Sequence, residues 1–449
     1  AHFLAARDDV DFTDPDADES VAAGSGTRYA WVTLDTVWSA RLQSRTLLSY
    51  GRTHNGRSGR LAEEGVYLAS VEDHRNLNVL GLGQDWSLRA SGRLLLKWGA
   101  SARWLDSTYG YVSFSEEDPS ATRALDLFAH GTQAGAYLAA QFRPWDALTL
   151  ETGLRWDHQS HTGETQASPR VSLTHEVGRA GRIRAAWGRY SQSQGVHELP
   201  IEDGVTSFFP AQTAAHWTLG FERELGGGLA FRADAYRKDV FRPRPRFENL
   251  FNPYELLPEF EPDRLRIDPE RAAARGIELT LARDAGGPVD WSATYSRSAA
   301  VDIIDGRRVP RSRDQPHAFQ FALGYRSATW EAGLAGLWHT GWPTTAMGGR
   351  PVEKPGGETV IEPVPGPRNG DRFPDYHRLD FRIGRHLRFG RGRLTIYAEV
   401  TNLYDRRNVC CAEDFIFVPR ADGSVLVERE DGYWLRRLPS LGITWRFDP

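Results

Sequence analysis

Arginine and aromatic side chains are concentrated in one long polar connection, residues 241–273, and give it the chemistry of a ligand-binding surface. Guanidinium groups bind carboxylate, phosphate and catecholate oxygens, and aromatic rings stack on flat ligands. An ordinary solvated loop is the alternative interpretation. The candidates in this connection are Arg242, Arg244, Arg246, Phe251, Tyr254 and Phe260, and Phe208, Phe209 and Trp342 are further aromatic candidates in other connections.

Motifs of the common enzyme classes are absent from the sequence. No lysine follows a glycine, so there is no phosphate-binding loop, and the Gly81-x-Gly83 and Gly390-x-Gly392 pairs lack the third glycine of a dinucleotide site. His197-Glu198 does not continue to a second histidine, and no Gly-x-Ser-x-Gly motif occurs. We therefore predict that the chain is no enzyme and holds no cofactor and no metal, although a catalytic set assembled from separate strands needs no motif.

The two cysteines, Cys410 and Cys411, are adjacent. Their Cα atoms lie about 3.8 Å apart, which is closer than the separation in an ordinary disulfide. A strained bond between neighbours and two free thiols both remain open. Two cysteines exclude a disulfide scaffold and every cysteine-rich metal site.

Apolar and polar residues alternate with a period of two through most of the chain, which is typical of strands. The segments in which this alternation is unbroken have about 9–13 residues, the length that a tilted strand needs to cross a bilayer. We count about eighteen such segments and no convincing amphipathic helix. Apolar residues at Leu148, Leu150, Leu154 and Trp156 alternate with Glu151, Arg155 and Asp157, and Leu379, Phe381 and Ile383 alternate with Arg378, Asp380 and Arg382.

The connections alternate between short turns rich in glycine, proline or serine and long polar segments. This order indicates tight turns at one rim and large loops at the other, as in a transmembrane antiparallel up-and-down β-barrel. The apolar face must then point to lipid and the charged face to the lumen. A soluble all-β protein is the alternative, in which the apolar face packs against a second sheet.

Composition excludes several other classes. The 449 residues carry a formal net charge of −4, which gives no reason to expect a nucleic-acid partner. No stretch approaches about 18 consecutive apolar residues, so a helical membrane protein is excluded.

Several segments resemble the barrel of TonB-dependent outer-membrane receptors. RGIELTLARDAGGPVDWSATYSRS (275–298) is similar to a hairpin of that family, and VPRSRDQPHAFQFALGYR (309–326) to its next strand. TNLYDRRN (401–408) resembles the motif after the penultimate strand, and LPSLGITWRF (438–447) the closing strand. The resemblance covers about residues 29–447.

The resemblance implies a monomeric active importer in the Gram-negative outer membrane, in contact with lipid. Its cargo is a scarce large solute, such as a ferric siderophore, haem, cobalamin or a glycan. The TonB energising complex acts through a plug in the lumen, and the family barrel has 22 strands. We expect residues 1–28 to form an acidic loop or the end of a missing upstream segment, and residues 29–449 to form a barrel that is incomplete at its N-terminal side. The plug and about four strands are then expected upstream.

Two alternatives remain from other classes. A passive 18-stranded porin would pair its first strand, near Tyr29, with its last, near Phe447. A soluble all-β glycan-binding or hydrolytic protein would need no detergent.

Overall fold

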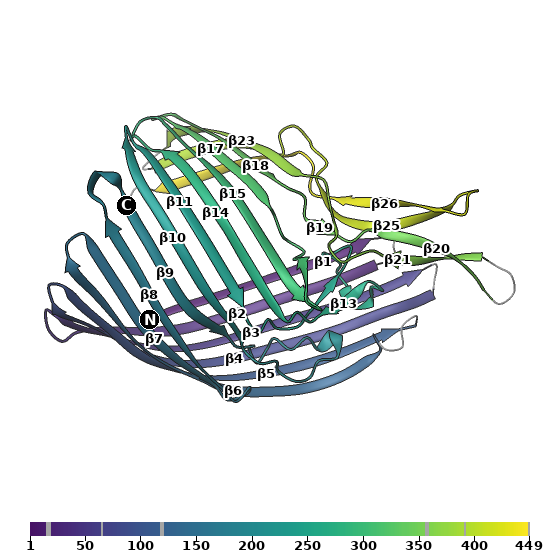
Figure 1. The fold of residues 1–449 in the computed structure, drawn as a ribbon, viewed down its shortest axis with the longest axis horizontal. Coiled ribbons are helices and arrows are strands. Elements are labelled where there is room, and N and C mark those ends of the chain that lie inside the picture. The colour runs from purple at the N-terminus through teal and green to yellow at the C-terminus, as the bar shows by residue number, and fades with distance from the viewer. Residues whose placement is uncertain (15–18, 64–65, 117–120, 355–358, 390–391, 448–449) are drawn as a thin grey trace.

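One large antiparallel sheet dominates the computed structural model, which describes residues 1–14, 19–63, 66–116, 121–354, 359–389 and 392–447. The sheet has 19 strands, and each long strand between β1 and β27 pairs with the long strand before it and the one after it (Figure 1). The short strand β16 folds back on β15. The other eighteen strands form an uninterrupted meander, as the alternation in the sequence predicted.

The bounds of the sheet strands show long elements in the N-terminal part and shorter ones in the C-terminal part. The strands are β1 His2–Asp14, β2 Glu19–Val37, β3 Leu42–Glu63, β4 Val66–Ser91, β5 Leu94–Ser115, β6 Arg123–Trp145, β7 Leu148–Gln159, β8 Glu164–Glu176, β9 Arg182–Gln192, β10 Gln212–Gly226, β11 Leu229–Val240, β14 Arg271–Arg283, β15 Val289–Ile304, β16 Arg307–Pro310, β17 His317–Arg326, β18 Trp330–His339, β23 Tyr376–Phe389, β24 Gly392–Thr401 and β27 Leu438–Phe447.

Smaller elements occupy the connections between the sheet strands, chiefly the long ones. Three single-turn 3-10 helices are η2 Gly178–Ala180, η3 Ile201–Asp203 and η4 Pro258–Phe260. Four two-stranded sheets pair β12 Arg246–Asn249 with β13 Arg264–Ile267, β19 Pro343–Thr344 with β22 Asp371–Arg372, β20 Met347–Glu353 with β21 Thr359–Pro365, and β25 Val409–Pro419 with β26 Val425–Tyr433.

The apolar face of the sheet points away from the protein, as predicted. Leu154, Leu219 and Ile277 are each more than half exposed, because no other element packs on them. The opposite face carries ion pairs such as Arg155–Asp157 at 2.6 Å. Large apolar side chains in such numbers at a surface indicate contact with lipid rather than water. No helix in the described residues is long and apolar enough to span a membrane.

The prediction of an acidic loop over residues 1–28 is wrong. β1 and β2 form a hairpin whose register runs from His2 opposite Trp31 to Asp14 opposite Glu19. The acidic run suggested a loop, but its charges are tolerated in a strand because most of β1 pairs with the part of β2 that lies beyond the apolar band, where charged side chains meet water. Residues 15–18 lie outside the described part of the chain.

Five strands are much longer than the predicted 9–13 residues. β2 has 19 residues, β3 and β5 have 22, β6 has 23 and β4 has 26. Their apolar alternation covers only one part of each strand, and their other part is rich in glycine and polar residues. The sequence pattern therefore detected the lipid-facing part and missed its continuation toward the rim with the long loops.

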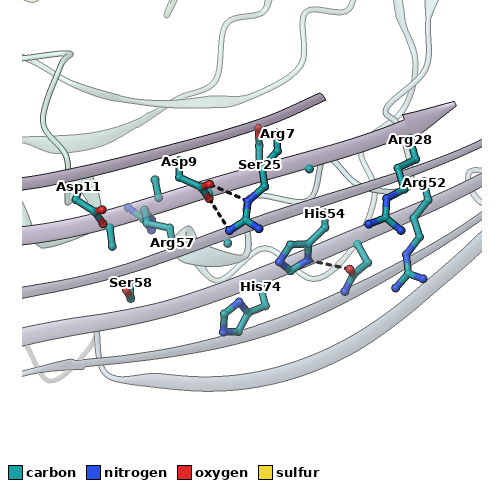
Figure 2. Close-up of a pocket in the computed structure, with 16 residues that line it drawn as sticks. Arg7, Asp9, Asp11, Ser25, Arg28, Arg52, His54, Arg57, Ser58 and His74 are labelled. Atoms are coloured by element: carbon teal, nitrogen blue, oxygen red, sulfur yellow. Dashed lines mark hydrogen bonds and ion pairs between the residues drawn. The ribbon is translucent and has the colours of Figure 1, made fainter. Parts of the chain in front are cut away.

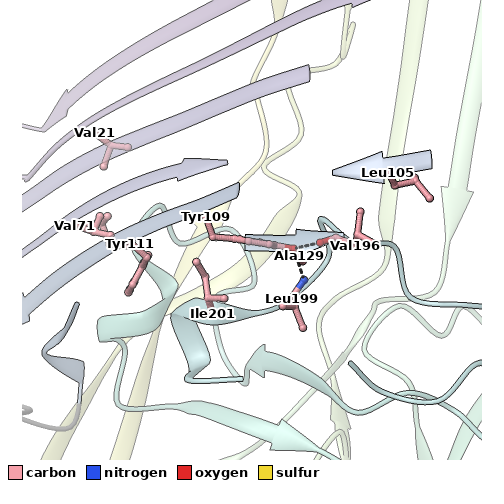
Figure 3. Close-up of a cluster of buried hydrophobic side chains, with 10 residues drawn as sticks. Val21, Val71, Leu105, Tyr109, Tyr111, Ala129, Val196, Leu199 and Ile201 are labelled. Atoms are coloured by element: carbon pink, nitrogen blue, oxygen red, sulfur yellow. Dashed lines mark hydrogen bonds between the residues drawn. The ribbon is translucent and has the colours of Figure 1, made fainter. Parts of the chain in front are cut away.

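Loops fold back against the inner face of these long strands. Tyr109 and Tyr111 on β5 and Val71 on β4 pack against Leu199 and Ile201 from the 193–211 connection (Figure 3). The core of the molecule therefore lies inside the curved wall. Among the described residues, β1 pairs only with β2, and β27 pairs only with β24, so each end of the meander has one unpaired edge.

Candidate functional site

A cavity of about 610 Å³ opens among the long loops. It is lined by residues of four connections: 246–264 around β12 and η4, 311–313 after β16, 342–373 after β18, and Cys410 at the start of β25. We call it the mouth cavity. The hairpins that surround it leave the sheet at the end where the long connections arise (Figure 1).

Buried ion pairs hold these connections together. The carboxylate of Asp302, at the end of β15, is completely buried and accepts a hydrogen bond from Nη2 of Arg246 at 2.6 Å. Arg246 also pairs with Glu248, which accepts hydrogen bonds from Ser312 Oγ at 2.6 Å and from Arg368 Nη2 at 2.7 Å. The network thus joins three segments that are far apart in sequence: residues 246–248, 302–312 and 368.

Electrostatics keep Glu248 ionised. Burial by itself raises the pKa of this carboxyl, but the hydrogen bond from Ser312 and the guanidinium groups of Arg246 and Arg368 lower the pKa to about 2. The arginines of this network are therefore already neutralised by protein carboxylates.

Aromatic rings form one wall of the mouth cavity. Phe251 meets Phe415 edge to face, with ring centroids 4.7 Å apart. Tyr254 packs behind this wall on Trp434 at 5.1 Å, and Trp434 in turn contacts Trp342 at 6.1 Å. Such a surface can stack on a flat ligand.

Two polar groups of the mouth cavity have no protein partner among the described residues. Arg313 is exposed and makes no ion pair there. The indole Nε1–H of Trp342 is buried without a hydrogen-bond acceptor. A buried donor that lacks an acceptor costs free energy, so a bound anion that accepted this hydrogen bond would be stabilised.

The predicted residues fall into two groups. Arg246, Phe251 and Trp342 line the mouth cavity, and Tyr254 lies directly behind it. The other five lie elsewhere, and one of them, Phe260, packs against the inner core cluster that contains Tyr109 and Ile201. Arg242 is 3.7 Å from Glu164, Arg244 is 3.0 Å from Glu198, Phe208 meets the His161 ring at 4.9 Å, and Phe209 lies under Arg266.

Three arginines that line the cavity were missed: Arg264, Arg311 and Arg313. Arg264 pairs with Asp203 at 2.6 Å. Arg311 and Arg313 flank Ser312 in a connection that was predicted only as a loop and as part of a family motif. Arg311 contacts Asp302 at 3.5 Å, whereas Arg313 is unpaired among the described residues. Two arginines at alternate positions in a loop were the available signal.

Three carboxyl groups near the mouth cavity have raised pKa values, because their surroundings destabilise the charged form. Burial raises the pKa of Glu255, and burial together with the charges of Glu255 and Asp263 raises the pKa of Glu261 to about 7. Burial also raises the pKa of Asp263, although this carboxylate accepts a hydrogen bond from the Phe251 amide at 2.8 Å. We therefore expect the order of the loop that carries Phe251 to depend on pH.

Both cysteines are free thiols. Cys410 lines the mouth cavity and is partly exposed, while Cys411 is buried. A hydrogen bond from Cys411 lowers the pKa of Cys410, and the same contact together with burial raises the pKa of Cys411. Of the two alternatives, the structure shows separate thiols.

Comparisons with known proteins agree on one architecture. The family described as "TonB dependent receptor-like, beta-barrel" matches residues 4–403. No curated protein matches the chain. Among solved structures, the chain is similar to the ferric citrate transporter FecA, with a TM-score of 0.61 and 14% identity over 95% of this chain and 62% of that one. It is similar to BauA, the ferric preacinetobactin receptor from Acinetobacter baumannii, with a TM-score of 0.59 and 13% identity over 95% of this chain and 63% of that one. It is also similar to the copper transporter OprC (0.64, 13%, 99% and 72%).

These similarities show the fold. The chain spans less than two thirds of the length of FecA and of BauA. The aligned part of each solved structure corresponds to the strand meander and its loops.

Proposed function

Because this chain belongs to the TonB-dependent receptor-like β-barrel family, whose barrels reside in the Gram-negative outer membrane, we propose that it forms the barrel of an active importer for an anionic metal chelate. A ferric siderophore is the leading cargo. In this proposal a plug couples the barrel to the TonB energising complex. The barrel provides the route through the membrane and the first ligand contacts, and it breaks no bond.

One observation carries the choice of cargo. The mouth cavity combines a guanidinium at Arg313 and an indole donor at Trp342, neither of which has a partner in the described part of the chain, with an aromatic wall that includes Phe251. A chelate with carboxylate or catecholate oxygens would satisfy both donors, and its flat groups would lie on the rings. A neutral glycan would leave the guanidinium without a counter-charge, so we favour the anionic class.

The unpaired edges of the sheet favour this proposal over a passive porin. A self-contained 18-stranded pore would need β1 to pair with β27, and the described residues show no such pairing. Long unpaired edges are avoided in native sheets. A soluble glycan-binding or hydrolytic protein is disfavoured by the exposed apolar face, which includes Leu219 and Ile277.

The test is binding to the purified, detergent-solubilised protein. Equilibrium dialysis would compare ferric citrate, a ferric catecholate, a ferric hydroxamate, haem, cyanocobalamin and a neutral oligosaccharide. We expect at least one anionic ferric chelate to bind. Arg313→Gln is expected to weaken that binding by about 10-fold or more, because a hydrogen bond to a charged group contributes about 1.5–3 kcal/mol.

The matched control is Arg420→Gln. Arg420 is an exposed arginine at the tip of the β25–β26 hairpin, and it does not line the mouth cavity. Its substitution removes the same charge from the same side of the barrel, so binding should be unchanged. Equal losses in both variants would assign the effect to net charge, and binding of only the oligosaccharide would refute the proposed cargo.

A further inference from the structure

The outer wall of the barrel carries a basic patch next to its lipid-facing band. We define the outer basic patch as Arg28 on β2, Arg52 and His54 on β3, and His74 on β4. It borders a hollow of about 1060 Å³ on the long N-terminal strands (Figure 2). The cargo site proposed above does not include it.

Strand register places this patch on the outer face. Arg52 and His54 alternate in phase with the exposed residues Leu48 and Tyr50 on the same strand, so all four side chains leave the same face. On β5, the residues of the opposite phase, such as Tyr109, are buried against the inner loops. The patch therefore faces the surroundings of the barrel.

Register also fixes the depth of the patch. Ala30, Tyr50, Leu80 and Trp104 are mutually aligned on neighbouring strands. Arg28 and Arg52 form the next pair on the same face, two residues further along each strand, which is about 7 Å. Tyrosine and tryptophan typically mark the membrane interface, so these arginines lie at the level of the lipid headgroups.

The direction along the strands identifies the leaflet. From Arg28, β2 runs through Val32 to Val37 and the tight turn at residues 38–41. Arg28 and Arg52 therefore lie beyond the apolar band toward the opposite rim, where the long loops arise. In outer-membrane barrels that rim faces the outside, so the patch meets the outer leaflet.

No carboxylate pairs with the two arginines of the patch in the described part of the chain, and the acidic residue in their row is Asp106 on β5, which aligns with Asn78, the partner of Arg52. Arg7, which also borders the hollow, is neutralised by Asp9 at 2.7 Å. Arg28 and Arg52 make no ion pair or side-chain hydrogen bond within the described ranges. Asp9 and Asp11 border the hollow further from the apolar band, since Asp9 aligns with Gly24 and Asp11 with Ala22.

Glycines create the space beside the patch. Gly24 and Gly56 are aligned partners on β2 and β3, and Gly26 is aligned with His54. A Cβ atom at Gly26 would meet nothing within 4 Å. The hollow is therefore open surface large enough for a phosphorylated headgroup beside the two guanidinium groups.

We infer that the outer basic patch binds the phosphate groups of an outer-leaflet lipid, with Arg28 and Arg52 as the phosphate ligands. Guanidinium groups bind phosphate through paired, charge-assisted hydrogen bonds. Their alkyl stems lie along the apolar band while their charged ends stay in the headgroup layer. Along the wall, the apolar band is followed by the row that contains Tyr50 and Trp104 and then by Arg28 and Arg52. This order matches the acyl chains, the interface and the phosphate groups of such a lipid.

The experiment measures lipid binding to the purified chain in a neutral detergent. Native mass spectrometry would quantify the complex with a bis-phosphorylated lipid A, with its dephosphorylated form, and with inorganic phosphate. We expect the bis-phosphorylated lipid to bind and the other two probes to bind far more weakly. Arg28→Gln/Arg52→Gln should weaken binding by about 30-fold, the change expected for two basic residues near an anionic membrane surface.

The matched control is Arg41→Gln/Arg89→Gln, which removes two exposed arginines at the tight-turn rim. It should bind lipid as the unmodified chain does. Arg28→Lys/Arg52→Lys should retain most of the binding, because the charge is kept. Folding of each variant is checked by the heat-dependent mobility of the barrel on gels.

Three outcomes would overturn the inference. The first is unchanged lipid binding by a folded glutamine pair. The second is equal binding of the dephosphorylated lipid, which would show that the acyl chains alone are recognised. The third is saturable binding of inorganic phosphate at the same site, which would show a site for a free anion.

Discussion

Nη2 of Arg246 donates to the carboxylate of Asp302 across 2.6 Å, and the Asp302 side chain has no exposure to solvent. Arg246 begins β12 in a loop, whereas Asp302 lies near the end of β15 in the wall. The pair therefore anchors the loop that carries Phe251 to the barrel. It also explains why this arginine is not available to a ligand through Nη2.

Removing Arg246 should release this loop. Arg246→Ala leaves a buried carboxylate without its main counter-charge, and breaking a buried pair in this way costs about 3–5 kcal/mol. Hydrogen exchange of residues 246–267 should become markedly faster. Arg7→Ala is the control, because the Arg7–Asp9 pair is exposed and its loss should change nothing measurable. Equal protection in Arg246→Ala and the unmodified chain would contradict the anchoring role.

The same loop should be better ordered in acid. The pKa of Glu261 is raised to about 7 from an ordinary value near 4.5, chiefly by burial. Folding of the loop therefore favours the protonated carboxyl, and this stabilisation is complete below about pH 4.5 and lost as pH rises through about 7. Hydrogen-exchange protection of residues 250–267 should fall over that range after correction for the intrinsic exchange rate. Glu261→Gln should weaken this pH dependence, and an unchanged dependence would assign it to other groups.

The two thiols should differ in reactivity. Cys410 is partly exposed with a lowered pKa, whereas Cys411 is buried with a raised pKa. Thiolate character and access both favour alkylation at Cys410. Labelling with a maleimide, followed by mass spectrometry, should modify the Cys411→Ser variant much faster than the Cys410→Ser variant. Comparable rates would show that the start of β25 opens in solution.

Neighbouring residues on β23 should respond oppositely to substitution. Phe381 belongs to the apolar phase of the strand, and an arginine facing the lipid midplane costs about 2–4 kcal/mol. Phe381→Arg should therefore lower the folded fraction recovered in lipid vesicles. Arg382 contacts Glu399 at 3.3 Å and Glu331 at 3.5 Å on the luminal side, where water reaches all three side chains. Arg382→Ala should be tolerated, and a similar loss in both variants would contradict the assignment of faces.

The strands of the wall could be predicted because the side chains of each strand alternate between a lipid-facing and a luminal side. Residues such as Leu154 and Ile277 alternate with polar neighbours, and that local pattern was sufficient to predict about eighteen strands. The acidic β1 was missed, because Asp8, Asp9 and Asp11 suggest a loop unless it is known that this part of the hairpin lies beyond the lipid-facing band.

The site was only partly predictable. Arg246, Phe251 and Trp342 converge on one cavity, in the region where ligand contacts were expected. Arg242 and Arg244 instead pair with Glu164 at the start of β8 and with Glu198 in the 193–211 connection. Those pairings depend on which loops meet at the mouth, and one sequence without a structure does not contain that information.

Because the N-terminal strands are so long, one part of the barrel wall lies in lipid and the other part lies in water. The 26 residues of β4 extend about 86 Å, of which a bilayer core of about 30 Å covers less than half even when the strand is tilted. The remainder stands in water and needs an apolar interior of its own, which Tyr109, Tyr111 and Ile201 provide on the concave side. Insertion into lipid is therefore not sufficient to fold this protein. The part of the wall outside the bilayer must also pack against its inner loops, as a small soluble β-domain packs around its core.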